Sequence, residues 1–360
     1  MIKRILAVWM LVFFAWCIMP ADERVALDHE VGRAESAAMS IEVEQGHAAV
    51  RAFDGELLEL WAQSPVLRVR VELREPGPRT LRLHVFNCMR DAVLVQAGES
   101  SAGEELPGHR AGRAFEVAVS DGALLELGVV GAQREEAFTF AVLSDVQSGV
   151  DRVSDVFARM NQDPELSFVV STGDLVDTGA REELVRFQRE LAILEVPLFS
   201  TVGNHEMGAP PQPWHEVFGP FNVHFVFKGT TFSLLDSGNA TIDPHVYDRL
   251  DAWLAGAQQA AHVVLTHVPP LDPIGLRGGA FRSRKEAAKL MQKLADGRVD
   301  ALFLGHIHSY YAFSAAGVPS YISGGGGAIP ERLDGIERHY LRVRMSPTQG
   351  IEDVAVVRVD

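Results

Sequence analysis

The chain of 360 residues carries 33 Lys and Arg against 48 Asp and Glu, which gives a formal net charge of −15 at pH 7. A surface of that sign repels polyanions, so we expect no nucleic-acid partner held by neutralisation of its phosphates. With 47% hydrophobic residues, the chain is long and apolar enough to bury a sizeable core, and we expect two domains.

Residues 1–21 have the composition of a secretory signal peptide. Lys3 and Arg4 precede an apolar run from Ile5 to Met19, and Ala21 lies just ahead of acidic residues. The run is shorter than the about 20 residues that a membrane span needs, so we expect cleavage near Ala21 and no stable membrane span afterwards. The protein is then exported, to the periplasm or the medium. An uncleaved N-terminal membrane anchor is the alternative.

Cys17 and Cys88 are the two cysteines of the chain. The first is removed with the signal peptide, so the mature protein is expected to have no internal disulfide, even in an oxidising compartment. Cys88 is expected to be a buried small hydrophobic residue. A metal site built on cysteines is excluded by their number.

Residues 22–135 are predicted to form a small, β-rich N-terminal domain. The pattern is weak up to Ser64, but Leu67–Leu73 and Leu81–Val85 alternate apolar and polar residues on either side of a Pro-Gly-Pro turn. Short alternating strands separated by turns are typical of a β-sandwich. Three isolated histidines of this domain are expected to be structural or solvent-exposed: His47, His84 and His109.

A polar segment, Gly131–Glu136, is the predicted linker to a second domain over residues 136–345. There, strand-like apolar runs alternate with helical stripes, of which Val153, Val156, Phe157 and Met160 form the first. Similar stripes occupy residues 184–194, 246–254 and 287–294. The alternation predicts an α/β domain in which helices cover sheet layers. Residues 346–360 are expected to be a C-terminal strand or tail.

Polar groups that can bind metal ions follow five strand-like runs of this second domain. The carboxyl ends of strands in such a sheet form the crevice where functional sites gather. Each run is therefore expected to end at the same edge of a sheet. In chain order, these groups are Asp145 and Gln147, then Asp174, then Asn204 and His205, then His267, and finally His306 and His308.

This series of motifs resembles the calcineurin-like metallophosphoesterases, whose pattern is D-x-H, G-D, G-N-H-[DE], H and G-H-x-H. The resemblance covers about residues 137–343, and every block appears in family order. It departs from the pattern at Gln147, where most members have His. The fold that it implies is a four-layer αββα sandwich, two packed mixed sheets with helices outside, here preceded by the small all-β domain.

The resemblance also implies a dinuclear metal centre. Oxygen and imidazole ligands without thiolate suit Mn, Fe, Zn or Co. Two such ions would make a bridging hydroxide available as nucleophile and would neutralise phosphoryl oxygens. The first ion would take Asp145, Gln147, Asp174 and His308, and the second would share Asp174 and add Asn204, His267 and His306.

The resemblance assigns catalysis to His205, which would donate a proton to the leaving oxygen or stabilise the phosphoryl group. Asn204 and His205 would contact the substrate. Arg277, in a Gly-rich and Arg-containing loop over residues 271–283, would meet the substrate anion, unless this loop is only a solvated surface loop. Asp177 is expected to support an imidazole or to cap a helix. Gly324–Gly327 is expected to allow close backbone approach behind the metal site.

The function that these observations predict is hydrolysis of phosphate mono- or diesters by an exported, metal-dependent phosphoesterase. Its substrate would be a phosphorylated small molecule or a phosphoprotein. The alternative is a catalytically weak sensor or binding protein that keeps the fold and the metals. Gln147 and the added β domain motivate this alternative, whereas the six intact metal-binding and catalytic groups beyond it argue for an enzyme.

Overall fold

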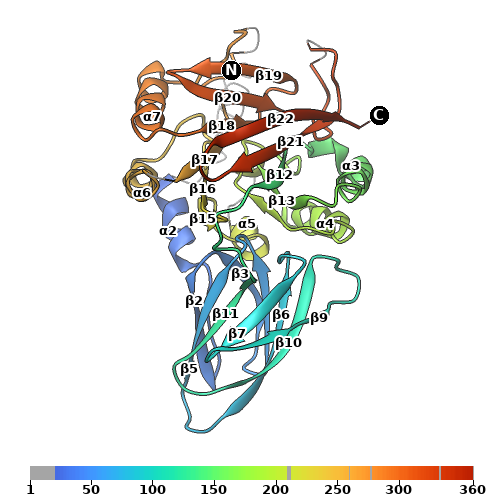
Figure 1. Ribbon diagram of the computed structural model, residues 1–360, viewed down its shortest axis with the longest axis vertical. Helices are drawn as coiled ribbons and strands as arrows, with labels where there is room; N and C mark the ends of the chain where they lie inside the picture. The colour runs from blue at the N-terminus through green and yellow to red at the C-terminus, as the bar shows by residue number, and fades with distance from the viewer. Residues whose placement is uncertain (1–20, 209–211, 259, 276–277, 332–333, 360) are drawn as a thin grey trace, which may run out of the picture.

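The computed structural model describes residues 21–359 apart from residues 209–211, 259, 276–277 and 332–333. A β-sheet domain lies at one end of an elongated molecule, and a layered α/β domain lies at the other (Figure 1). Residues 1–20, which make up nearly all of the predicted signal peptide, lie outside the described residues. Within the described ranges, no helix is both long and apolar enough to cross a membrane.

The N-terminal domain consists of two packed sheets, with strand orders β1-β2-β5-β11-β7-β8 and β3-β4-β6-β10-β9. The alternation predicted for β5 and β6 is present, because Val69 and Leu83 are buried while Arg68 and Arg82 are not. Cys88 is also buried, and burial raises the pKa of its thiol to about 12. The strands are β1 (Arg33–Glu35), β2 (Met39–Gln45), β3 (Ala48–Phe53), β4 (Leu57–Ala62), β5 (Leu67–Leu73), β6 (Arg79–Phe86), β7 (Ala92–Gln96), β8 (Glu99–Ala102), β9 (Glu104–Glu105), β10 (Gly112–Val119) and β11 (Ala123–Val129).

The second domain is built on two sheets, with strand orders β14-β13-β12-β21-β22 and β15-β16-β17-β18-β20-β19. Phenylalanines fill the space between them, and the ring centroid of Phe232 lies 5.2 Å from that of Phe140 and 5.4 Å from that of Phe168. The strands are β12 (Phe138–Leu143), β13 (Leu166–Ser171), β14 (Leu198–Ser200), β15 (Val223–Phe227), β16 (Thr230–Leu235), β17 (Ala261–Thr266), β18 (Ala301–Leu304), β19 (Tyr310–Ala315), β20 (Val318–Ser323), β21 (His339–Ser346) and β22 (Gly350–Arg358).

Helices cover the outer face of each of these two sheets. The apolar sides of α3 and α4 pack on the β12–β14 sheet, and those of α6 and α7 pack on the β15–β20 sheet. The predicted four-layer αββα architecture is therefore confirmed, and each predicted apolar stripe lies on one of these helices except that Leu194 follows the end of α4. The helices are α3 (Val153–Met160), α4 (Arg181–Leu191), α5 (Gln212–Val217), α6 (Pro244–Gly256) and α7 (Arg284–Asp296).

Helix α2 (Ala21–Glu30) precedes the β domain in sequence but contacts α5 and α6 of the second domain. Its Asp28 carboxylate accepts hydrogen bonds from the backbone N–H groups of Phe221 at 2.7 Å and Asn222 at 3.2 Å. Its Arg24 donates to the Asp236 carboxylate at 3.0 Å, and both side chains are buried. Buried charged side chains need such partners, and these bonds anchor α2 to the second domain. The weak sequence pattern of residues 22–64 did not reveal this helix.

The two domains are also joined by side-chain amides that pair with the edge strand β14. Asn87 accepts from the Leu198 N–H and donates to the Leu198 carbonyl, both at 2.8 Å. Gln63 accepts from the Ser200 N–H at 3.0 Å. These bonds satisfy backbone groups that an edge strand otherwise leaves unpaired.

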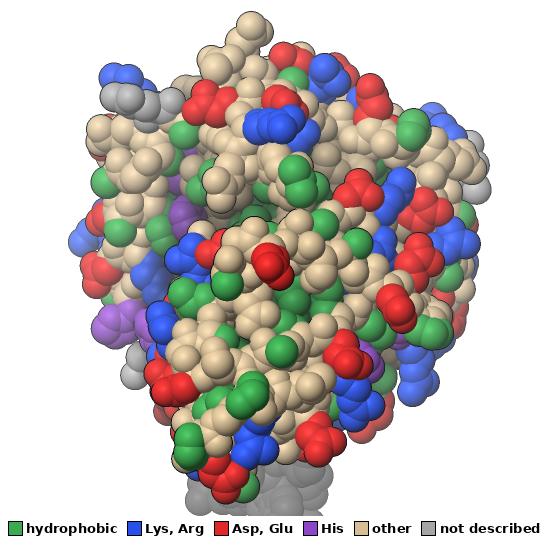
Figure 2. All heavy atoms as spheres, turned by 60° about the horizontal axis from the view of Figure 1, so that its bottom comes forward, with side chains coloured by type: hydrophobic (Ala, Val, Ile, Leu, Met, Phe, Trp, Pro, Cys, Tyr) green, Lys and Arg blue, Asp and Glu red, His purple; other side chains and the backbone are tan. Residues whose placement is uncertain are grey.

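Viewed with the tip of the β domain forward, Figure 2 shows acidic and basic side chains intermingled on this face of the molecule.

Candidate metal centre

The strand ends that carry the predicted ligands meet at one edge of the sandwich. Strands β12, β13 and β14 are parallel in one sheet, and β17 and β18 are parallel in the other. The segments that follow them touch one another through hydrogen bonds and short contacts. The structure thus brings together Asp145, Gln147, Asp174, Asn204, His205, His267, His306 and His308.

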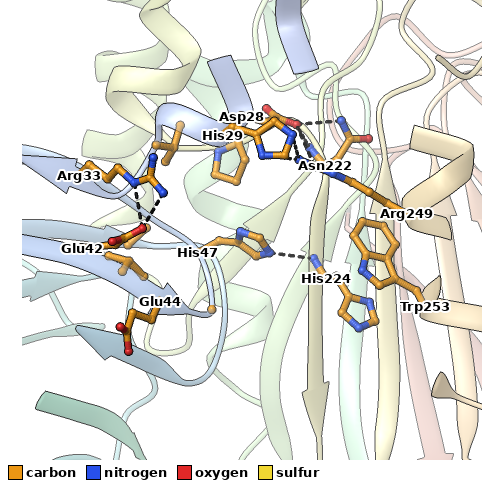
Figure 3. A pocket seen from close by; sticks show the side chains of 15 residues that line it. Asp28, His29, Arg33, Glu42, Glu44, His47, Asn222, His224, Arg249 and Trp253 are labelled. Atoms are coloured by element: carbon orange, nitrogen blue, oxygen red, sulfur yellow. Dashed lines mark hydrogen bonds and ion pairs between the residues drawn. The ribbon is translucent and has the colours of Figure 1, made fainter. Parts of the chain in front are cut away.

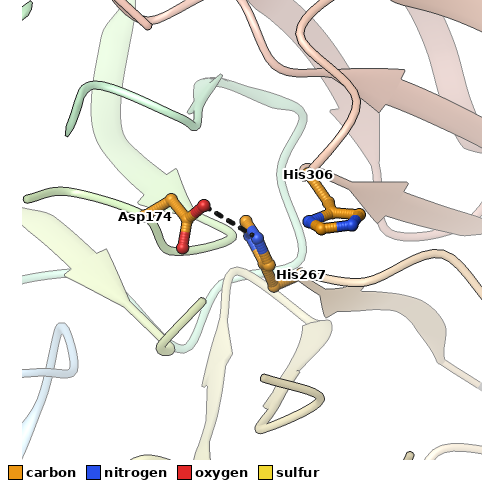
Figure 4. A group of neighbouring side chains, drawn as sticks. All are labelled: Asp174, His267 and His306. Carbon is orange, nitrogen blue, oxygen red and sulfur yellow. Dashed lines mark ion pairs between the residues drawn. The ribbon is translucent and has the colours of Figure 1, made fainter. Parts of the chain in front are cut away.

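Asp174 lies at the centre of this group. Its Oδ2 is 2.9 Å from Gln147 Nε2, 3.2 Å from His267 Nε2 and 3.9 Å from His205 Nε2. A carboxylate oxygen of Asp174 and one ring nitrogen from each of His267 and His306 all lie within 4.8 Å of one another. Figure 4 shows these three side chains next to one another, although they come from segments far apart in the sequence. Asp174 and His267 are fully buried.

The remaining candidates extend the group on both sides of Asp174. On one side, His308 Nε2 lies 3.5 Å from Asp145 Oδ1 and 3.3 Å from Gln147 Nε2. On the other side, His267 Nε2 lies 3.1 Å from Asn204 Oδ1. Two sets of oxygen and nitrogen donors therefore meet at a single carboxylate.

The histidine rings are oriented by backbone carbonyls. Nδ1 of His267 lies 3.1 Å from the Thr172 oxygen, and Nδ1 of His308 lies 2.8 Å from the Ile329 oxygen. A neutral imidazole that donates its Nδ1–H to a carbonyl presents the Nε2 lone pair on its other side. Here that side faces the other candidate ligands. The donor set and its orientation therefore fit transition-metal ions.

His205 is oriented in the same way by the carbonyl of Asp177. The distance from His205 Nδ1 to this oxygen is 2.7 Å. Asp177 thus supports an imidazole as expected, but with its backbone oxygen and not its carboxylate. It does not cap α4, whose N-cap residue is Ala180. The side chain of His205 is 34% exposed, so it is open to a molecule arriving from solvent.

Glycines allow the ligand-bearing turns to approach one another. A Cβ added at Gly203 would lie 2.0 Å from Asp174 Oδ1, one at Gly173 would lie 2.2 Å from the Gly203 nitrogen, and one at Gly305 would lie 2.3 Å from Ser144 Oγ. None of these separations is sterically possible. Backbone packing at the site thus explains the glycines in the Gly-Asp, Gly-Asn-His and Gly-His segments of the motifs.

The Gly324–Gly327 segment has the role expected of it. A Cβ at Gly324 would lie 2.3 Å from the Ile307 oxygen, and one at Gly326 would lie 2.4 Å from the Ser144 oxygen. The segment therefore packs its backbone directly behind the two turns that carry Asp145 and His306.

Four of the candidate ligands have left-handed backbone conformations. The φ angles are 60° at Asp145, 45° at Gln147, 52° at Asp174 and 70° at His306. Non-glycine residues adopt this region rarely and at a cost in free energy. Such residues tend to cluster at functional sites, where the surrounding structure holds them in place. The clustering here is an indication of function that is independent of residue type.

Glu206 is a residue of the site whose role the sequence did not show. Its buried carboxylate accepts from the N–H groups of Asp174 at 3.0 Å, Leu175 at 2.8 Å and Gly203 at 2.7 Å. These hydrogen bonds link the turn that carries Asp174 to the turn that carries Asn204. Burial, followed by the charge of Asp174, raises the pKa of Glu206 to about 7. The one signal in the sequence is its place as the acidic residue of the G-N-H-[DE] motif.

The buried charges at the centre influence one another strongly. Burial acts to lower the pKa of His267, but the neighbouring Asp174 carboxylate outweighs it and raises this pKa to about 9. Burial acts to raise the pKa of Asp174, but His267 and then His205 hold it below its usual range. Positive charge close to the carboxylate therefore stabilises its ionised form, and a bound cation would supply such charge.

The loop over residues 271–283 approaches the site from one side. A Cβ at Gly279 would lie 3.1 Å from the Ile307 side chain and 3.5 Å from that of His306. Asp272 shapes the loop by accepting from the N–H groups of Ile274 and Gly275, at 2.9 and 2.8 Å. Arg277, the predicted substrate contact, lies outside the described residues.

Comparisons with known proteins find similarity to phosphoesterases. The family model described as calcineurin-like phosphoesterase matches residues 138–310. A protein of Rhodopseudomonas palustris, described as a probable cyclic nucleotide phosphodiesterase, is 27% identical over 190 residues, which cover 49% of this chain and 69% of that protein.

Solved structures also match this chain. The purple acid phosphatase from yellow lupin (Lupinus luteus) seeds matches with a TM-score of 0.53 and 11% identity, over 82% of this chain and 73% of that one. A dimetal phosphatase from Danio rerio matches with a TM-score of 0.48 and 14% identity, over 62% of this chain and 99% of that one. The lupin match extends beyond residues 138–310, so the likeness in fold includes part of the remaining chain.

Proposed function

We propose, from the premise that residues 138–310 form a calcineurin-like phosphoesterase domain, that this chain hydrolyses phosphate mono- or diesters with two bound metal ions. One observation carries the proposal. Carboxylate, amide and imidazole groups from five strand ends gather around the Asp174 carboxylate. His267 turns its Nε2 toward this carboxylate at 3.2 Å, and His308 turns its Nε2 toward Asp145 Oδ1 at 3.5 Å.

The donors divide into two sets that share Asp174. The metals that suit these donors are Mn, Fe, Zn or Co, and two such ions would lower the pKa of a water molecule and neutralise charge on the phosphoryl oxygens. The first set is Asp145, Gln147, Asp174 and His308, and the second is Asp174, Asn204, His267 and His306.

His205 is the proposed catalytic side chain because it is fixed and accessible at once. Its Nδ1 is held by the Asp177 carbonyl, and its backbone N–H donates to Asp174 Oδ1 at 2.9 Å. In the imidazolium form, Nε2 carries a proton that can pass to the leaving oxygen of an ester bound at the centre. Asn204, whose amide lies beside His267, would help to hold the phosphoryl group.

The substrate is proposed to be a phosphorylated small molecule or a phosphoprotein. The relatives differ in their described activities, since one is a probable cyclic nucleotide phosphodiesterase and another is a purple acid phosphatase. The side chains around the metal centre decide between such substrates. We also propose export of the chain, on the composition of residues 1–21, and N-terminal sequencing of the mature protein tests it.

A substrate panel on the metal-reconstituted mature protein tests the proposed activity. We expect hydrolysis of p-nitrophenyl phosphate, of its bis(p-nitrophenyl) diester, or of both, followed by a clear preference among a phosphopeptide, a nucleoside monophosphate and a cyclic nucleotide. Exhaustive chelation should abolish this activity, and Mn or another transition metal should restore it. Full activity in metal-free protein would contradict the proposal. Two filled metal sites without any hydrolysis would favour the sensor or binding protein instead.

Gln147→His tests the one departure from the family motif. An amide oxygen is an uncharged and weaker donor than imidazole for Fe or Zn, so the ion held by Asp145 and His308 should be the first to dissociate. Unlike a histidine ligand, Gln147 also has no ring nitrogen through which a backbone carbonyl could orient the side chain. We expect two unequal affinities in calorimetric titration of the metal-free protein. The histidine variant should bind the weaker ion more tightly, provided that the ring fits. Two equal affinities, unchanged in the variant, would show that Gln147 does not limit metal binding.

A further inference from the structure

Cavities other than the metal centre lie where the β domain meets the α/β domain. The cavity in Figure 3, of about 330 Å³, is polar, but its charged side chains already have partners, which for Glu44 is Arg70 outside the cavity. Arg33 bonds to Glu42 at 2.6 Å, and Arg249 bonds to the His29 ring at 2.7 Å. Such a cavity offers a ligand no unsatisfied charge.

A second cavity, of about 400 Å³, differs in this respect. It lies between β3 of the β domain and helices α4 and α5 of the α/β domain, and we call it the junction cleft. Arg51 and His109 line it from the β domain, and Arg181, Arg189 and Glu216 line it from the helices. Positive charge therefore predominates in this cleft, although the chain as a whole carries a net charge of −15.

Arg51 is the central observation. Its guanidinium lies over two aromatic rings, 4.3 Å from the centroid of Trp61 and 5.4 Å from that of Phe86. It makes no ion pair or side-chain hydrogen bond with any residue that the structure describes. Burial lowers the pKa of Arg51 to about 10, although the negative charge of Glu59 acts to raise this pKa. The Glu59 carboxylate lies next to a different side chain, with its Oε1 3.4 Å from His84 Nδ1. A partly desolvated cation without a direct ion pair is costly, so the retention of Arg51 points to an anionic ligand.

Further donors lie in or next to the same cleft. Arg189 is exposed and forms no ion pair or side-chain hydrogen bond within the described ranges. A separate small cavity shares His109 with the cleft and is also lined by Trp61. Trp61 is 2% exposed, and its indole Nε1 has no hydrogen-bond partner among the described residues. The acid of the cleft, Glu216, is already paired with Arg181.

We propose that the junction cleft binds a small oxyanion, a phosphate-type group or a carboxylate. Guanidinium groups bind both through two parallel N–H bonds, and a neighbouring indole N–H can donate to a third position. None of the residues of the cleft is a candidate metal ligand, so this is a second site. The anion would also hold the two domains together, because its partners come from β3 on one side and α4 on the other.

Calorimetric titration of the full mature chain with sulfate and, separately, with succinate tests the site. Sulfate stands for a phosphate-type group without being a product of the proposed reaction, and succinate stands for a carboxylate. We expect saturable binding of at least one probe, a tenfold or greater loss of affinity in Arg51→Gln, and partial recovery in Arg51→Lys, which keeps the charge. Arg186→Gln is the matched control, because Arg186 is an exposed arginine of α4 outside the cleft, paired with Asp151.

Two further variants make the outcome decisive. Asp174→Ala should keep the binding, because it alters the metal centre alone, and binding lost in this variant but kept in Arg51→Gln would overturn the proposal. Arg189→Gln changes an exposed residue, so it should fold and should weaken binding several-fold even where Arg51→Gln fails to fold. Equal affinity in wild type, Arg189→Gln and Arg51→Gln, or no saturable binding of either probe, would also overturn it.

Discussion

Asp174→Ala should lose metal and activity together. Its carboxylate lies between the two proposed ligand sets, 2.9 Å from Gln147 and 3.2 Å from His267, so removing it takes a ligand from both ions at once. We expect elemental analysis to find fewer than one ion per chain and kcat/KM to fall by more than about 100-fold, the upper range for residues that only orient a metal ligand.

Asp177→Ala is the matched control for this variant. Asp177 is a carboxylate three positions further along the same turn, but it contributes its backbone carbonyl to His205, which alanine retains. Metal content and kcat/KM should therefore stay near the wild-type values. If Asp174→Ala retained two ions, or if both variants lost metal equally, Asp174 would not be the shared ligand.

His205→Ala should separate catalysis from metal binding. The ring of His205 lies 3.9 Å from Asp174 Oδ2 and is partly exposed, whereas the candidate ligands His267 and His308 are more deeply buried. We expect the variant to retain both ions and to lose about 10²–10⁴ in kcat, the range for removal of a general acid. Elemental analysis and steady-state kinetics on the same preparation measure both quantities. His245→Ala, at an exposed histidine of α6, is the control and should change neither.

The choice of substrate distinguishes the two roles considered for His205. If the ring protonates the leaving oxygen, an alkyl phosphate should suffer much more from the substitution than p-nitrophenyl phosphate, whose leaving group needs little protonation. If the ring stabilises phosphoryl charge, both substrates should suffer alike. Loss of both ions in His205→Ala would show that His205 is a ligand and that neither role applies.

The amino-acid sequence by itself determined which strands and helices form within residues 138–346. Apolar runs of strand length and stripes of helical period are local signals, and they predicted the sheets and α3, α4, α6 and α7. Parallel strands end at a common edge, so polar residues after five such runs could be expected to meet. Glycine before Asp174, Asn204 and His306 was visible as a motif, although its reason, the close approach of three turns, needed the structure.

Only the tertiary structure decided the contacts that join distant segments through backbone atoms or single side chains. The G-N-H-[DE] motif marks Glu206 without showing that its carboxylate accepts from backbone N–H groups. Asp177 acts through its backbone carbonyl, which every residue possesses, so no pattern of side chains indicates its role. Helix α2 is anchored by Arg24 to a carboxylate 212 positions away. Arg51 in the sequence is one charged residue in a short apolar segment, and its lack of a direct ion pair can be recognised only in the folded structure. Local periodicity fixes which elements form, whereas pairing between elements depends on a three-dimensional arrangement that periodicity does not contain.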